Sequence, residues 1–257
     1  MNISYAALAF VLTVVPAAIA SEPDTLAVAN VSRDTIDQTP SGWENALSKH
    51  QKAYTNYTVR YDDSGPYIHA AANSAGSWIE RDIELLGADR YPILEWEWKV
   101  DRFPEVEWER NPNQDDFAIR LELVYDYRGG KWNVLNLVRK GLITSFFRGA
   151  PPVLTISYVW SREVPVDDHY QSPESSRITV IPIESGAGLT GKWLREQRIL
   201  RADLNRHLAG ERNVVLKKIR IRCDTESSGT TAESGIRNIR LIRDGRDHGQ
   251  PSADHTK

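Results

Sequence analysis

The stretch Ile93-Leu94-Glu95-Trp96-Glu97-Trp98-Lys99-Val100 decides the fold of this chain. Every second residue from Leu94 to Val100 is apolar and the residues between them are charged, a period of two that is typical of a β-strand with one buried side. Its two tryptophans lie on the apolar side and form a large surface, because each aromatic side chain can bury about 150–250 Å². Such a surface needs a second apolar layer opposite it, so the pattern predicts a two-layer β architecture.

Further segments along the chain have a strand-like composition and are separated by Gly, Pro, Asn and Asp. They lie at 54–61, 67–72, 77–85, 115–125, 153–160, 177–183, 194–200, 217–223 and 236–242. They do not alternate with long helices, as the strands of a parallel sheet do, so a mainly β fold is predicted, an antiparallel β-sandwich. Short helices are predicted near 43–47 and 203–208.

The two ends of the chain differ from this pattern. Residues 1–20 form a short apolar run that closes with Ala18-Ile19-Ala20, which is typical of a cleaved signal peptide. An uncleaved anchor is the alternative, although fewer than about 18 strongly apolar residues is short for a membrane span. We therefore expect a periplasmic or secreted protein with an N-terminal arm at 21–42, a sandwich domain at 43–243 and a disordered tail at 244–257.

Composition excludes several classes of function. The net charge is −3, so nothing favours nucleic-acid binding, which usually needs a basic stripe. The single cysteine, Cys223, cannot form an internal disulfide, and its alternation with Ile219 and Ile221 predicts a buried structural thiol. No zinc-protease, nucleotide-binding or serine-hydrolase motif is present, and the histidines show no metal-ligand spacing.

Residues 129–152 interrupt the series of strands. Apolar residues recur there at roughly helical spacing, with four basic residues among them. One interpretation is a basic amphipathic lobe that contacts lipid or a partner protein. The other is a short helical insertion packed over an open end of the sandwich.

Several segments, in their order, resemble one family of exported bacterial proteins, the domain-of-unknown-function family DUF3047. They are Leu94–Asp101, Asp115–Arg120, Ser157–Ser161, Trp193, Arg198 and Asp224–Gly229. The resemblance implies a β-sandwich of the jelly-roll kind, similar in outline to carbohydrate-binding modules, and it implies no established activity. The chain departs from the family at Glu226, Ser227 and Ser228, and at Arg220 and Arg222, where the family has small apolar residues.

Two acidic segments are the first candidates for a ligand site. Asp116 and Arg120 share a strand face, and a carboxylate beside a guanidinium suits the hydroxyls of a sugar. The alternative is a structural charge network. The run from Asp224 to Gly229 carries oxygen atoms that could hold Ca²⁺, or that could simply bond their own turn. The predicted ligand-binding residues are Asp115, Asp116, Arg120, Arg222, Asp224 and Glu226.

Three other groups leave alternatives open. Tyr158 and Trp160 either stack against a sugar ring or belong to the core, and their apolar neighbours favour the core. The charged residues Glu95, Glu97, Arg120, Glu122, Arg220 and Arg222 would form a ladder if their strands were neighbours, and on a concave face their arginines would favour an anionic glycan such as a uronate. Residues 167–170, Asp-Asp-His-Tyr, could supply acid and base groups.

The sequence thus favours an exported, non-catalytic domain that binds a glycan or glycan-like envelope component. The main alternative is a lyase or glycoside hydrolase that uses Asp115, Asp116, His169 or Tyr170. A third is an envelope interaction protein that acts through 129–152. No cofactor is expected other than calcium, and the oligomeric state is not predicted.

Overall fold

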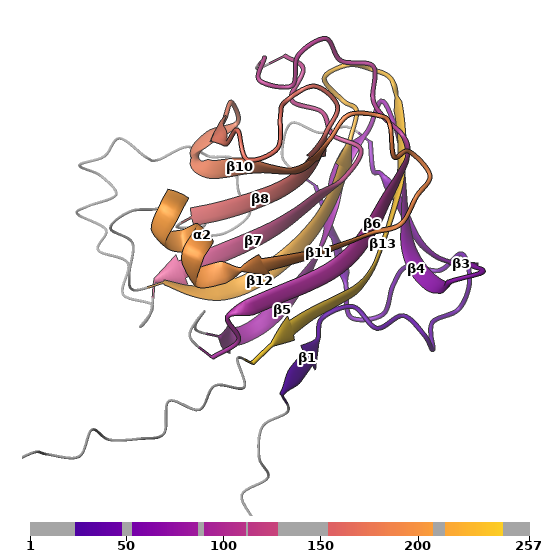
Figure 1. Cartoon of the computed structure of the whole chain (residues 1–257). Helices are drawn as coiled ribbons and strands as arrows, with labels where there is room; N and C mark the ends of the chain where they lie inside the picture. The colour runs from indigo at the N-terminus through magenta and orange to yellow at the C-terminus, as the bar shows by residue number, and fades with distance from the viewer. Residues whose placement is uncertain are drawn as a thin grey trace, which may run out of the picture.

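Two curved β-sheets lie face to face in the computed structural model, which describes residues 24–47, 53–86, 90–111, 113–127, 154–207 and 214–243 (Figure 1). The first sheet has the order β11-β6-β13-β4-β3, with β1 also paired to β13. Its strands are β11 (Leu194–Ile199), β6 (Ile93–Arg102), β13 (Thr231–Ile242), β4 (Gly65–Asn73), β3 (Asn56–Asp62) and β1 (Thr25–Ala27). We call it the six-stranded sheet.

The second sheet, the seven-stranded sheet, has the order β2-β5-β12-β7-β8-β10-β9. Its strands are β2 (Glu44–Ala46), β5 (Gly76–Leu86), β12 (Val214–Asp224), β7 (Arg120–Tyr127), β8 (Leu154–Ser161), β10 (Ser175–Ser185) and β9 (Tyr170–Ser172). All pairings are antiparallel except that of β8 with β10, which is parallel. The antiparallel sandwich predicted from the sequence is confirmed, with this one parallel pair as a difference.

The strand quoted first is β6, and its apolar side lies in the core. Leu94, Trp96, Trp98 and Val100 are each at most 1% exposed. The ring of Trp96 stacks on Tyr158 of β8 with centroids 5.5 Å apart, and Trp98 lies 6.2 Å from Trp160. These contacts join the two sheets, so Tyr158 and Trp160 are core residues. Cys223 is also fully buried, as predicted.

The strand predictions held better than the boundaries did. Each predicted strand segment overlaps an observed strand, but β7 begins only at Arg120, because Asp116 and the residues around it bind other loops. The segment near 43–47 forms β2 and no helix, since its backbone pairs with β5 at the sheet edge. The helix α2 (Leu200–His207) is where one was predicted, and it buries Leu200 and Leu204.

The two ends of the described chain lie side by side. Strand β1, which belongs to the predicted arm 21–42, pairs with the end of β13, and the amide of Arg243 donates to the carbonyl of Asp24 at 2.8 Å. Within the described residues no helix has the length and apolarity that crossing a membrane requires. The predicted signal peptide 1–20, the insertion 129–152 and the tail 244–257 lie outside the described residues.

Candidate functional site

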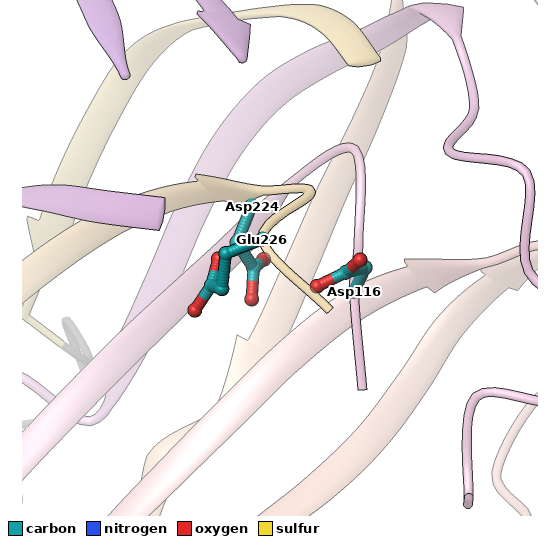
Figure 2. A group of neighbouring side chains, drawn as sticks. All are labelled: Asp116, Asp224 and Glu226. Carbon is teal, nitrogen blue, oxygen red and sulfur yellow. The ribbon is translucent and has the colours of Figure 1, made fainter. Parts of the chain in front are cut away.

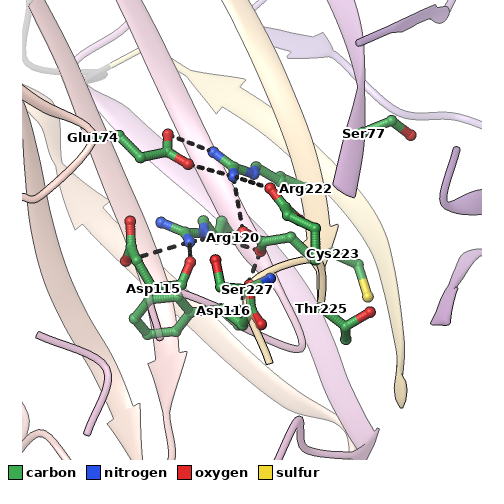
Figure 3. Close-up of polar contacts among 12 residues, drawn as sticks. Ser77, Asp115, Asp116, Arg120, Glu174, Arg222, Cys223, Thr225 and Ser227 are labelled. Carbon is green, nitrogen blue, oxygen red and sulfur yellow. Dashed lines mark hydrogen bonds and ion pairs between the residues drawn. The ribbon is translucent and has the colours of Figure 1, made fainter. Parts of the chain in front are cut away.

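The six residues predicted to bind a ligand lie together at neighbouring ends of β7 and β12. Figure 3 labels Asp115, Asp116, Arg120 and Arg222 among them. Arg120 and Arg222 are directly opposite each other in the register of these two strands. Asp115 and Asp116 precede β7, Arg120 begins it, Arg222 and Asp224 end β12, and Glu226 lies in the turn that follows. We call this group, together with Glu174, the charge cluster.

Arg120 binds the centre of the charge cluster. Its Nε donates to Oδ1 of Asp224 at 3.2 Å and its Nη2 to Oδ2 at 2.8 Å. The same Nη2 lies 3.4 Å from the carboxylate of Asp115 and donates to the backbone carbonyl of that residue. A two-point guanidinium–carboxylate contact of this kind fixes both side chains in one geometry.

Arg222 connects the buried Asp224 to two glutamates at the edge of the charge cluster. Its Nη2 lies 2.9 Å from Asp224 and 3.3 Å from Glu226. Its two Nη atoms also donate to both oxygens of Glu174, at 2.8 and 2.6 Å. Glu174 lies in the turn between β9 and β10 and was not predicted as a site residue, because no local pattern connects that turn with β12.

Five residues of the charge cluster are buried, whereas the side chains of Glu174 and Glu226 are 40% and 27% exposed. Asp115, Asp116, Arg120, Arg222 and Asp224 are each at most 4% exposed. Burial raises the pKa of Asp115 to about 6. Burial alone would also raise the pKa of Glu174, but Arg222 and its hydrogen bonds outweigh that effect and lower it to about 2. This arrangement favours the structural interpretation, because the polar groups of the five buried residues face one another.

Three carboxylates of the charge cluster, those of Asp116, Asp224 and Glu226, approach one another within 4.8 Å (Figure 2). These oxygens would be the ligands of the predicted calcium ion. Asp116, however, accepts hydrogen bonds from the amides of Ser227 and Ser228 at 3.2 and 2.6 Å. The two arginines contact Asp224, but they are shared with Asp115, Glu174 and Glu226, so the charge cluster keeps an excess of negative charge. A cation would therefore have to replace hydrogen bonds that Asp116 and Asp224 already accept.

The charged residues of β6 do not meet those of β7 and β12. Glu95 and Glu97 project from the six-stranded sheet, whereas Arg120, Glu122, Arg220 and Arg222 belong to the seven-stranded one. The ladder considered from the sequence therefore does not include β6, and within it only β7 and β12 are neighbours, with Glu122 opposite Arg220. The glutamates of β6 pair within their own sheet instead, Glu95 with Arg195 and Arg240 at 2.8 Å each, and Glu97 with Arg237 at 2.7 Å.

The four residues at 167–170 are divided among separate contacts. Asp168 binds Arg110 at 2.5 Å, and the ring of Tyr170 lies under the same guanidinium with a centroid distance of 4.8 Å. His169 is exposed and its ring contacts that of His207. His169 is thus not brought to Asp115 or Asp116, whereas Tyr170 lies near Asp115: burial, followed by the charge of Asp115, raises the pKa of Tyr170.

An open pocket of about 360 Å³ lies on the six-stranded sheet, next to β1. It was not predicted, because it forms only when the arm pairs with β13. A bulge in β13 shifts the register between Arg237 and Arg240, and Asn238 there has a left-handed backbone with φ of 53°. Its lining consists of Thr25, Ala27, Ala29, Asn30, Val31, Ser32, Ser64, Pro66, Arg237, Asn238, Ile239 and Arg240. We call it the arm pocket.

Two aromatic side chains, Tyr67 and Trp193, adjoin the arm pocket, and we call them the aromatic shelf. Arg237, which lines the pocket, stacks on the ring of Trp193 at 4.0 Å, and Tyr67 meets the same ring edge-on at 5.3 Å. The indole nitrogen of Trp193 donates to Asp62 at 2.7 Å. Gly235 allows this arrangement, since a Cβ atom there would lie 2.9 Å from Tyr67 and 3.1 Å from Trp193.

Known proteins with similar structures share little sequence with this chain. A family 11 carbohydrate-binding module of a Clostridium thermocellum cellulosomal cellulase is 8% identical, with a TM-score of 0.41 over 89% of this chain and 99% of its own. A family 12 xyloglucanase from Bacillus licheniformis is 7% identical, with a TM-score of 0.43 over 85% and 100%. We infer neither ligand nor reaction from likenesses of this size.

No curated protein matches the sequence. A family model, in contrast, matches residues 41–240, which is most of the chain and almost all of the described sandwich. The match agrees with the resemblance read from the order of segments. The chain therefore belongs to the DUF3047 family, which is described as a protein family of unknown function.

Proposed function

We propose that this chain is an exported, non-catalytic domain that binds a glycan or glycan-like envelope component in the arm pocket. The observation that carries the proposal is the pocket itself. Its wall has hydrogen-bond donors and acceptors, and the aromatic shelf lies beside it. Its volume of about 360 Å³ is in the range of small-ligand sites. Export rests on the apolar run at 1–20, which is a sequence prediction.

The lining suits a ligand with many hydroxyl groups. A sugar hydroxyl donates one hydrogen bond and accepts others, so it needs both donors and acceptors. The hydroxyl of Ser64 offers both, the amide group of Asn30 offers donors and the amide oxygen of Asn238 an acceptor, and the guanidinium groups offer donors. Asn238 donates through its amide nitrogen to Glu97 at 3.0 Å, and Asn30 accepts from Ser32 at 2.7 Å. Small apolar side chains between them, such as Ala27 and Pro66, match the C–H faces of a sugar ring.

Two exposed guanidinium groups near the pocket favour an anionic ligand. Glu95 is paired with both Arg195 and Arg240, whereas Arg237 is paired with both Glu97 and Asp62, so the whole group is balanced in charge. The side chains of the two arginines are 60% and 40% exposed, and Arg240 lines the pocket. An exposed guanidinium that shares its partner can turn to a carboxylate or a sulfate, which it binds in a bidentate manner.

The lining also argues against catalysis at this place. Glycoside hydrolysis generally needs a pair of carboxyl groups, and elimination needs a base and an acid. None of the residues that line the pocket is Asp, Glu, His, Lys, Cys or Tyr. The carboxylates considered for the enzyme alternative, Asp115 and Asp116, are buried in the charge cluster. The lobe 129–152, the basis of the third alternative, lies outside the described residues.

The test is binding to a panel of neutral and uronate-containing oligosaccharides, followed by calorimetry on the best ligand. Asn238→Gly removes the amide while glycine keeps the left-handed backbone. Arg240→Ala removes the exposed guanidinium, and Arg206→Ala on α2 is the matched charge control. The proposal expects weaker binding in the first two variants only. Product release from an oligosaccharide would support the enzyme alternative.

A further inference from the structure

Two histidines that are far apart in the sequence pack against each other at one end of the sandwich. His169 lies in the loop between β8 and β9, and His207 is the last residue of α2. Their ring centroids are 4.3 Å apart and the ring planes meet at 65°. Neither residue belongs to the charge cluster or to the arm pocket.

The ring nitrogens of His207 lack partners. Both Nδ1 and Nε2 are shielded from solvent, and neither has a hydrogen bond within the part of the chain that the structure describes. Buried polar atoms are almost always hydrogen-bonded, so an imidazole with two unused nitrogens needs an explanation. Burial, followed by the neighbouring His169, lowers the pKa of His207 and favours its neutral form, the form that binds metals.

Both backbones are held by contacts that do not involve the imidazoles. In the loop, the amide of Asp167 donates to the carbonyl of Pro182 at 3.0 Å, and Asp168 binds Arg110 at 2.5 Å. On α2, Asp203 accepts hydrogen bonds from Arg198 at 2.9 and 2.6 Å, and Leu204 is buried. The two rings are therefore presented by fixed elements, as ligands of a preorganised site are.

We propose that His169 and His207 together bind a divalent first-row transition metal ion such as Zn²⁺. Imidazole nitrogen suits Zn²⁺, Cu²⁺ and Ni²⁺, whereas Ca²⁺ and Mg²⁺ prefer oxygen. Two protein ligands leave further coordination positions to water or to a bound molecule. The ion would satisfy one orphan nitrogen of His207 and tie the end of α2 to the β8–β9 loop. This site is independent of the proposed glycan binding.

The test is calorimetric titration of the full chain with Zn²⁺, together with Cu²⁺ electron paramagnetic resonance. We expect one high-affinity ion per chain, at least tenfold weaker binding in His169→Ala and in His207→Ala, and unchanged binding in Arg206→Ala. The Cu²⁺ spectrum should show two coordinated nitrogens in the native chain and one in His169→Ala. That variant alters an exposed loop side chain, so it decides the question even if His207→Ala does not fold. Binding that survives the double variant would overturn the proposal.

Discussion

Arg120 and Asp224 are joined by two hydrogen bonds, of 3.2 and 2.8 Å, at a place where neither side chain is more than 1% exposed. Arg222 contacts the same carboxylate at 2.9 Å. The sequence left open whether these residues meet, and the fold brings them together. In the structure they connect β7, β12 and the loops beside them.

Replacing Asp224 with Ala should strongly destabilise the fold. The change leaves Arg120 and Arg222 buried without their shared counter-charge, and breaking a buried ion pair costs about 3–5 kcal/mol. The exposed Lys217, 3.7 Å from Asp126, provides the control, because Lys217→Ala should cost only about 0–1 kcal/mol. Urea unfolding measures both values. Equal losses in the two variants would show that the charge cluster does not hold the fold.

Calcium should not stabilise the protein. The oxygens of Asp116 and Asp224 already accept bonds from backbone amides and guanidinium groups, so an ion would have to displace them. Thermal unfolding with and without millimolar Ca²⁺ should give the same midpoint. An upward shift that disappears in Glu226→Ala would instead establish the metal site that the sequence suggested.

A carboxyl pair should make stability depend on pH. Glu196 of β11 is partly buried beside Glu184 of β10, and burial, then the charge of Glu184, raises its pKa to about 7. Because the pKa is higher in the folded than in the unfolded chain, the stabilisation is complete at and below about pH 4.5 and is lost as the pH rises toward 7.

Glu196→Gln should remove this dependence. The neutral amide keeps an acceptor for the indole of Trp98, which donates to Glu196 at 3.1 Å. Relative to the native chain, the variant should gain about 1–2 kcal/mol between pH 5 and pH 7.5, a range reduced for partial exposure. Urea unfolding at both pH values measures the change, with Glu163→Gln as the exposed control. Parallel pH profiles for native and Glu196→Gln chains would contradict the assignment.

Gly235→Ala should disturb the aromatic shelf. The new methyl group would lie 2.9 Å from Tyr67 and 3.1 Å from Trp193, closer than such contacts normally are. We expect a loss of about 1–3 kcal/mol, as for other overpacking changes. A shift in tryptophan fluorescence should accompany it. Gly188→Ala is the control, because nothing lies within 4 Å of its added methyl group. If Gly235→Ala changed neither the stability nor the fluorescence, Tyr67 and Trp193 would be able to move aside without cost.

The sequence predicted the sandwich because the strand pattern is local. In β6 the alternation of Trp96 and Trp98 with Glu95 and Glu97 determines which side is buried, whatever strand lies beside it. The three strands missed, β1, β2 and β9, have only three residues each, too few to show a period of two. The parallel pairing of β8 with β10 depends on the path of the chain between these strands, which local alternation of residues does not reveal.

The sites were harder to predict because their parts come from distant segments. The meeting of Arg120 and Arg222 depends on the register of β7 with β12, and Arg222 also binds Glu174 in another turn. The partners of Glu95 could not be inferred without knowing that β11 and β13 flank β6. The arm pocket requires β1, and the pairing of His169 with His207 requires α2 to lie beside the β8–β9 loop.

The most direct test of glycan binding compares the affinity of the native chain and of Asn238→Gly for the best uronate-containing ligand of the panel, measured by calorimetry. Losing a buried polar contact to a sugar costs about 1–3 kcal/mol, so the account predicts a roughly 5- to 150-fold weaker Kd with unchanged thermal stability. Equal affinity in the two chains, or no binding of any oligosaccharide by the native chain, would contradict it.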